Sequence, residues 1–212
     1  MVGEQKVLPK IPQKEYKAPL IGDDNAKVYV KTFRITGNTV LGSDELLPLT
    51  TTYQNKELSL GQMKEVASEI TKYYRNKGYF VARAYIPAQE LSQGVVEIAI
   101  IEGLYGSFEM KNSSRVKTEQ VQGFMDKLKG GDIVSTYSLE RQMLLINDLS
   151  GATVTNAEVL PGKEVGTSDF RITVEPTQAY SGYAILDNYG SKYTGRERVN
   201  VSGTINSISG KG

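Results

Sequence analysis

This chain of 212 residues contains the same order of expected elements twice: a strand, two helices and two further strands. The first copy has a strand over residues 28–36, helices over 43–50 and 59–77, and strands over 80–88 and 95–101. The second copy has a strand over 105–110, helices over 118–128 and 138–150, and strands over 152–160 and 169–175. The repeat period is roughly seventy-five residues, close to the smallest length that buries a core of its own. We therefore expect an α+β protein with two small domains in tandem.

The helix over residues 59–77 has the clearest pattern in the chain. Ser59 and Gln62 have the spacing of a capping box, and Gly78 suits the residue after the helix. Its apolar residues recur at intervals of three and four, as on one buried face. They are Leu60, Met63, Val66, Ala67, Ile70, Tyr73 and Tyr74.

The two strands after this helix differ in pattern. Residues 80–88 alternate, with Phe80, Ala82, Ala84 and Ile86 on one face and Val81, Arg83 and Tyr85 on the other. Residues 95–101 read VVEIAII, a nearly continuous apolar run that is typical of a central strand. The sequence therefore predicts that 95–101 lies in the middle of its sheet.

Composition excludes several classes of function. The 25 basic and 24 acidic residues nearly balance, which disfavours a basic groove for nucleic acid. The chain has no cysteine and no histidine, so thiolate or imidazole metal sites, cysteine nucleophiles and Ser-His-Asp triads are excluded. Carboxylate-only sites for magnesium or calcium remain possible on composition. Asp23, Asp24 and Glu119 show no pattern of an acid/base pair, so we expect no catalytic residues, no metal site, no cofactor and no enzyme.

The two ends of the chain differ from the repeats. Residues 1–27 contain three prolines and no periodicity, which predicts an extended linker, and they lack the apolar stretch of a secretory signal. This start fits either a cytoplasmic protein or a mature or truncated form.

Residues 180–188 and 196–206 form a hairpin of strands of about ten residues, the length that crosses a bilayer in a β-barrel. An ordinary soluble hairpin is the alternative. Two strands cannot close a barrel, so we expect the chain to be cut short of its natural end.

Three segments together resemble a known family. They are FRITGNTVL, NKGYFVARAYIPAQ with VVEIAIIEG, and LDNYGSKYTGRERV. The first two resemble a POTRA domain, and the third resembles the start of the barrel in the TpsB family, the outer-membrane transporters of two-partner secretion. The resemblance implies a first POTRA domain over 28–103, a second over 104–177, each with a three-stranded mixed sheet and two helices, and the first two barrel strands over 178–212.

The resemblance also implies where a partner binds. In POTRA domains the second strand lies at an open sheet edge, which here means residues 80–88 and 152–160. An open edge binds an extended peptide through its backbone groups, the mode called β-augmentation. The expected partner-binding residues are Tyr73, Tyr74, Phe80, Val81, Arg83, Tyr85, Ile86, Val154 and Asn156. Alternatively, Tyr73, Tyr74 and Phe80 belong to the core, and Arg83 and Tyr85 are solvated or protect the edge from aggregation.

By resemblance, the chain is the periplasmic receptor region of an outer-membrane transporter in a Gram-negative bacterium. It would recognise the N-terminal secretion domain of an unfolded TpsA-type adhesin or haemolysin and hand it to the barrel, and the complete barrel would contact outer-membrane lipid. The alternatives are an assembly factor that inserts other barrels, like BamA, or a POTRA interaction scaffold. Neither nucleic acid nor a cofactor is expected as a partner.

Overall fold

The computed structural model describes residues 16–91, 93–188, 190, 197–207 and 209–210. Two compact units make up the chain, and each is described by itself. The first extends to Gly106 and takes in Gly130–Thr136 and Gly162–Ser168, and the second comprises Ser107–Lys129, Tyr137–Pro161 and Asp169–Gly212. We call residues 28–103 the first repeat and residues 104–177 the second repeat.

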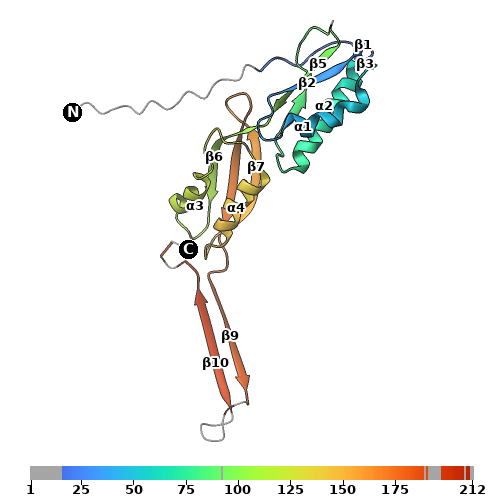
Figure 1. Ribbon diagram of the computed structural model, residues 1–212. Coiled ribbons are helices and arrows are strands. Elements are labelled where there is room, and N and C mark those ends of the chain that lie inside the picture. Colours follow the sequence, from blue (N-terminus) through green and yellow to red (C-terminus); the bar gives the residue numbers. More distant parts are fainter. Residues whose placement is uncertain (1–15, 92, 189, 191–196, 208, 211–212) are drawn as a thin grey trace, which may run out of the picture. The chain divides into compact units, whose positions relative to one another are not determined.

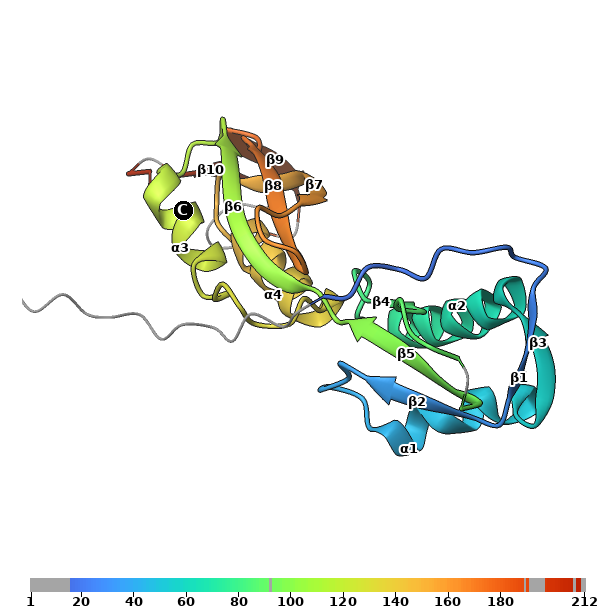
Figure 2. The ribbon, with the colours of Figure 1, turned by 90° about the horizontal axis from the view of Figure 1, so that it is seen from above.

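The first repeat has a three-stranded mixed sheet in the order β2-β5-β4. The central strand β5 (Val95–Ile101) pairs in parallel with β2 (Thr32–Thr36) and antiparallel with β4 (Arg83–Tyr85). On β5 every second side chain is buried: Val96, Ile98 and Ile100. They belong to the core of this repeat, and the position of β5 between β2 and β4 confirms the expected central strand (Figure 2).

Helix α2 (Leu60–Asn76) supplies the other half of this core. Ser59 caps the helix: its hydroxyl accepts from the N–H of Gln62, and its own N–H donates to the side chain of Gln62. The helix buries Leu60, Met63, Val66, Ala67, Ile70 and Tyr74, which is the predicted stripe apart from the half-buried Tyr73. A short helix α1 (Ser43–Leu46) and a 3₁₀ helix (Leu47–Tyr53) precede it, because Pro48 interrupts the regular α-helical bonding.

Two expected strands of the first repeat are shorter than predicted. The strand predicted over 28–36 is divided into β1 (Lys27–Val30) and β2, and β1 pairs with β3 (Lys56–Ser59), which the sequence did not indicate. The strand predicted over 80–88 is reduced to β4, because the N–H of Ala82 closes a turn onto the carbonyl of Tyr79.

The second repeat has the same organisation, with a sheet in the order β6-β8-β7. Its strands are β6 (Leu104–Asn112), β7 (Thr153–Pro161) and β8 (Thr167–Glu175), and its helices are α3 (Thr118–Met125) and α4 (Thr136–Asn147). Its core includes Val121, Met125, Ile146, Phe170, Ile172 and Val174. The repeated element order predicted from the sequence is therefore confirmed.

The remaining elements are β9 (Tyr180–Asp187) and β10 (Arg198–Ile205), which form an antiparallel hairpin (Figure 1). The residues of the expected barrel-start segment at 189 and 191–196 lie outside the described residues. Among the described residues, no helix combines the length and hydrophobicity that a membrane span requires.

Candidate functional site

Each repeat has one edge strand that lies beside its longer helix, β4 beside α2 and β7 beside α4. In both repeats a helix side chain binds the first outward N–H of that strand. The hydroxyl of Thr71 accepts from the N–H of Ala84 at 2.9 Å, and the side-chain oxygen of Asn147 accepts from the N–H of Val154 at 2.6 Å. Backbone groups alternate in direction along a strand. The groups of Ile86 and Ala88 therefore point to the outer edge of the first repeat, and those of Asn156 and Glu158 point to the outer edge of the second repeat.

The first edge is not open as predicted. Residues Lys17–Leu20, which we call the N-terminal strap, lie antiparallel along its end. The N–H of Leu20 donates to the carbonyl of Ile86 at 2.8 Å, and the N–H of Ala88 donates to the carbonyl of Ala18 at 2.7 Å. Pro19 faces Pro87 between these bonds, at a non-hydrogen-bonded position where neither ring needs an N–H. The prediction of an open edge over 80–88 is therefore wrong, because the segment interpreted as a free linker pairs with that edge.

Side chains also fix the N-terminal strap. The hydroxyl of Tyr85 donates to the carbonyl of Lys17 at 2.9 Å, and the ammonium of Lys17 lies 3.3 Å from the carboxylate of Glu97 on the solvent face of β5. Burial of the Glu97 carboxyl opposes its ionisation, but hydrogen bonds from Thr36, Arg34 and Lys17 outweigh burial and lower its pKa. The carboxylate therefore stays ionised at neutral pH and holds Lys17.

The structure places the predicted residues of the first edge in different surroundings. Arg83 is exposed, as expected for a residue that meets a partner. The hydroxyl of Tyr85 is occupied by the strap, and the side chain of Ile86 is buried. Val81 packs closely on Gly103, where an added Cβ would lie 2.4 Å from a methyl carbon of Val81. Of these four, Arg83 alone presents an exposed side chain.

The expected groove of Tyr73, Tyr74 and Phe80 does not form as predicted. Tyr74 is fully buried and donates its hydroxyl to the Glu102 carboxylate, so no partner reaches it. Tyr73 is half-buried, and its hydroxyl donates to Glu45 at 3.1 Å. Phe80 is half-buried in the turn that replaces the start of the predicted strand. The core alternative holds for Tyr74, because the buried stripe of α2 includes it.

The second edge has the features that were expected of both. In the described part of the chain, β7 pairs with β8 and with no other strand, and its residues Thr155–Val159 are exposed. A groove of about 430 Å³ runs between β7 and α4. It is lined by Glu140, Met143, Leu144, Asn147, Val154, Thr155, Asn156 and Ala157. The two residues predicted here, Val154 and Asn156, lie together in its wall.

Sequence reasoning missed the helix side of this groove. Met143 recurs at helical spacing with the buried Leu139 and Ile146, but it is itself half-buried and lines the groove. Leu144 lies off this buried row and is 61% exposed at the groove. Single exposed apolar residues are common on protein surfaces, so the sequence has no distinctive signal for this side of the groove.

The solvent faces of both sheets carry ion pairs. In the second repeat, Arg171 on β8 lies 2.9 Å from Glu109 on β6 and 3.3 Å from Glu158 on β7. In the first repeat the charges are reversed, with Glu97 at the centre and Arg34 and Lys17 beside it. These faces are charge-paired, so the groove between β7 and α4 is the better candidate for binding an apolar segment.

The motif residues of the first repeat form a network around Glu102. Its buried carboxylate accepts from the N–H and hydroxyl of Thr39, from the N–H of Val40 at 2.9 Å and from the hydroxyl of Tyr74 at 3.0 Å. Burial, and then the charge and hydrogen bond of Glu102, raise the pKa of the Tyr74 hydroxyl far above its ordinary value. Gly37 has a φ of +87°, and an added Cβ would lie 2.2 Å from the carbonyl oxygen of Ile100. These residues therefore stabilise the fold.

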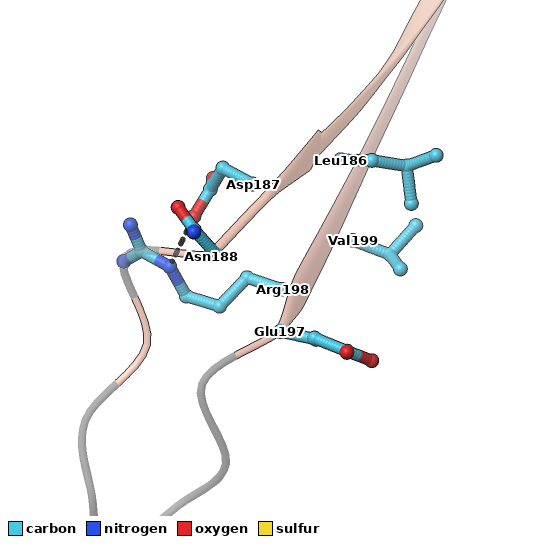
Figure 3. Close-up of a pocket in the computed structure, with 6 residues that line it drawn as sticks. All are labelled: Leu186, Asp187, Asn188, Glu197, Arg198 and Val199. Carbon is cyan, nitrogen blue, oxygen red and sulfur yellow. Dashed lines mark hydrogen bonds and ion pairs between the residues drawn. The ribbon is translucent and has the colours of Figure 1, made fainter.

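The hairpin of β9 and β10 has one apolar and one mainly polar face. Leu186 and Val199 are direct neighbours across the strands and project to the same side in Figure 3. Asp187 and Arg198 are ion-paired at 2.9 Å on the other side (Figure 3). Among the residues that the structure describes, no group of three or more acidic side chains has the arrangement of a metal site.

Comparison with known proteins gives the family. Residues 28–103 match the family model described as "POTRA domain, ShlB-type". The chain is 32% identical over 176 residues to the heme/hemopexin transporter protein HuxB of Haemophilus influenzae (strain 86-028NP), an alignment that covers 82% of this chain and 31% of the relative. It is 28% identical over 202 residues to the hemolysin transporter protein ShlB of Serratia marcescens, covering 94% of this chain and 32% of that relative.

A solved structure agrees with the fold. The structure of CdiB from Escherichia coli matches with a TM-score of 0.72 at 24% identity, covering 97% of this chain and 36% of that one. The chain thus spans about a third of the length of the curated relatives it matches. Residues 28–103 are a ShlB-type POTRA domain, and the chain belongs to the TpsB family of outer-membrane transporters, whose POTRA domains lie in the periplasm.

Proposed function

We propose that this chain is the receptor region of a two-partner secretion transporter and that it binds a secreted exoprotein in an extended conformation. The bound segment adds as a strand to β7 of the second repeat, and its apolar side chains enter the groove between β7 and α4. The handover of the exoprotein to a barrel that begins at β9 and β10 is part of the same proposal.

The observation that carries the proposal is the open edge of β7 with an apolar groove beside it. Outward N–H and C=O groups at Asn156 and Glu158 offer backbone bonds that do not depend on the side chains of the partner. Leu144, Met143 and Ala157 offer apolar contact area. Backbone pairing with a shallow groove suits a receptor for an unfolded chain, because many sequences satisfy it.

The expected affinity is modest. An unfolded segment loses conformational entropy when it is ordered on the edge, and this cost reduces the affinity for a given contact area. Weak binding is also what a handover requires, because the exoprotein must leave the receptor again. The Glu140 carboxylate in the groove favours segments that carry a Lys or Arg next to their apolar residues.

The test measures binding of the N-terminal secretion domain of a TpsA-type adhesin or haemolysin. Leu144→Glu places a charge in the groove and is expected to weaken binding at least tenfold. Val165→Glu makes the same change at a residue that is 71% exposed and outside the groove, and is the matched control. Equal affinities of these two variants would contradict the proposed groove.

A second variant tests the backbone contribution. Asn156→Pro removes an N–H that points to the outer edge, and proline is tolerated on an edge strand where its N–H is not used. The variant is expected to fold, as judged by an unchanged far-UV circular dichroism spectrum, and to lose binding. If it folds and binds normally, the exoprotein does not add to β7 as a strand.

A further inference from the structure

The N-terminal strap occupies the first edge in the way that an incoming strand would. It lies antiparallel to the end of the edge strand and takes the outward carbonyl of Ile86 and the outward N–H of Ala88. The corresponding edge in the second repeat pairs with no further strand in the described residues. One chain thus contains the same type of edge in an occupied and an open form.

The attachment of the strap is short. Two backbone hydrogen bonds, the hydroxyl bond from Tyr85 and the Lys17–Glu97 ion pair are its polar contacts among the described residues. Pro19 and Pro87 face each other at a non-hydrogen-bonded position, so this position adds no backbone bond. Two backbone hydrogen bonds therefore attach the strap within the described residues.

Little apolar surface holds the strap in place. Lys17, Ala18 and Pro19 are exposed, and Leu20 alone is half-buried against the core of the first repeat. The ion pair between Lys17 and Glu97 is exposed on the Lys17 side, so water and salt weaken it. An extended chain with more N–H groups and more apolar side chains makes better use of the same edge.

We propose that the N-terminal strap is a displaceable occupant of the first edge, which an incoming extended chain replaces. The strap covers the edge while no exoprotein is bound, and thereby prevents the edge from pairing with unrelated chains. Its release gives the exoprotein a second docking edge in addition to β7. The inference rests on the proposed function, because the incoming chain is the exoprotein of that proposal.

A disulfide lock tests whether the strap must move. The chain has no cysteine, so Pro19→Cys together with Pro87→Cys introduces a single pair. Facing residues at a non-hydrogen-bonded antiparallel position have Cα atoms about 4.5 Å apart, within the range of a disulfide. The oxidised chain has the strap fixed, and the same chain after reduction is its own control.

The first probe is a fluorescein-labelled synthetic peptide of residues 16–22 of this chain. In the intact chain the strap competes with the peptide at an effective concentration on the order of millimolar. The variant Lys17→Glu/Leu20→Pro reverses the charge that meets Glu97 and removes the N–H that binds Ile86. We expect this variant to bind the peptide at least tenfold more tightly than the unchanged chain. Equally weak binding by both would overturn the proposal.

The second probe is the secretion domain of the exoprotein, added to the locked and the reduced chain. We expect at least threefold weaker binding when the strap is locked. An unchanged affinity would overturn the displacement of the strap by the exoprotein. It would leave docking at β7 intact, because that is tested separately through Leu144 and Asn156. Failure of the strap proposal can be distinguished from failure of the proposed groove, because the peptide test uses no exoprotein.

Discussion

Replacing Glu102 with alanine is expected to destabilise the first repeat strongly. Glu102 is 6% exposed, and its carboxylate accepts four hydrogen bonds, from Thr39, Val40 and Tyr74. These bonds connect the turn after β2, the helix α2 and the end of β5. Loss of the carboxylate therefore disconnects three elements at once.

The burial of each donor sets the magnitude. The Tyr74 hydroxyl is fully buried, and leaving it without an acceptor costs roughly 1–3 kcal/mol. Thr39 is exposed and Val40 is half-buried, so their N–H groups regain water and lose about 1 kcal/mol in total. The sum predicts that Glu102→Ala lowers the free energy of unfolding by about 3 kcal/mol. Glu102→Gln retains an acceptor oxygen and places its NH₂ group near the Thr39 hydroxyl, so it should cost less, about 1 kcal/mol.

The assay is urea unfolding followed by the amide signals of the first repeat, such as that of Ile98. Tyr74→Phe removes the hydroxyl that Glu102→Ala strands, so the double variant should be less destabilised than the sum of the single variants, by about 1–2 kcal/mol. Glu57→Ala, at an exposed position of the same repeat, is the control and should change stability by no more than about 0.5 kcal/mol. A small effect of Glu102→Ala, or strict additivity with Tyr74→Phe, would refute this reasoning.

Three further predictions concern stability and are measured by the same urea assay. Gly37→Ala should lower the free energy of unfolding by at least about 2 kcal/mol more than Gly78→Ala does. Both glycines have a positive φ, but an added Cβ would lie 2.2 Å from a backbone oxygen at Gly37 and 3.9 Å from its nearest neighbour at Gly78. Equal losses would contradict the close packing at Gly37. Gln142→Met should stabilise the second repeat by about 1 kcal/mol, because the buried side-chain oxygen of Gln142 has no hydrogen-bond partner among the described residues; a loss of stability would contradict this. Stability should fall as the pH rises above the ordinary tyrosine pKa of 10.0, because Tyr74 ionises in the unfolded chain and stays protonated in the folded one. Tyr74→Phe should remove part of this pH dependence, and the same alkaline profile in both proteins would contradict the reasoning.

Much of the fold could be predicted from local pattern. The stripe and capping box of α2 and the continuous apolar run of β5 are properties of consecutive residues, and they specify the core of the first repeat. The second repeat has weaker patterns, but it repeats the element order and therefore the fold. The pairing of β1 with β3 was not predicted, because short polar strands such as residues 56–59 have no distinctive period.

The candidate site was harder to predict because it depends on contacts between distant residues. Alternation along 80–88 indicates which side chains share a face, but not which backbone groups already have partners. The backbone groups of Ile86 and Ala88 bind a segment some seventy residues earlier in the chain. The prolines and charges of that segment resemble those of a free linker. On the second edge, by contrast, the described residues include no strand beyond β8 that pairs with β7, and Val154 and Asn156 line the groove there.

The residues that identify the family and those that line the proposed binding groove are separate sets in this chain. Gly37, Thr39 and Glu102 belong to the motif segments, and each is occupied in positioning backbone or in a buried hydrogen bond. Leu144 and Ala157 in the groove belong to none of those segments. Transporters that share the motif can therefore share the fold and differ in what they bind, because exchange of groove residues does not disturb the Glu102 network. Specificity for an exoprotein should accordingly transfer with the α4 and β7 residues when these are exchanged between relatives, and the motif residues should be exchangeable without effect on partner choice.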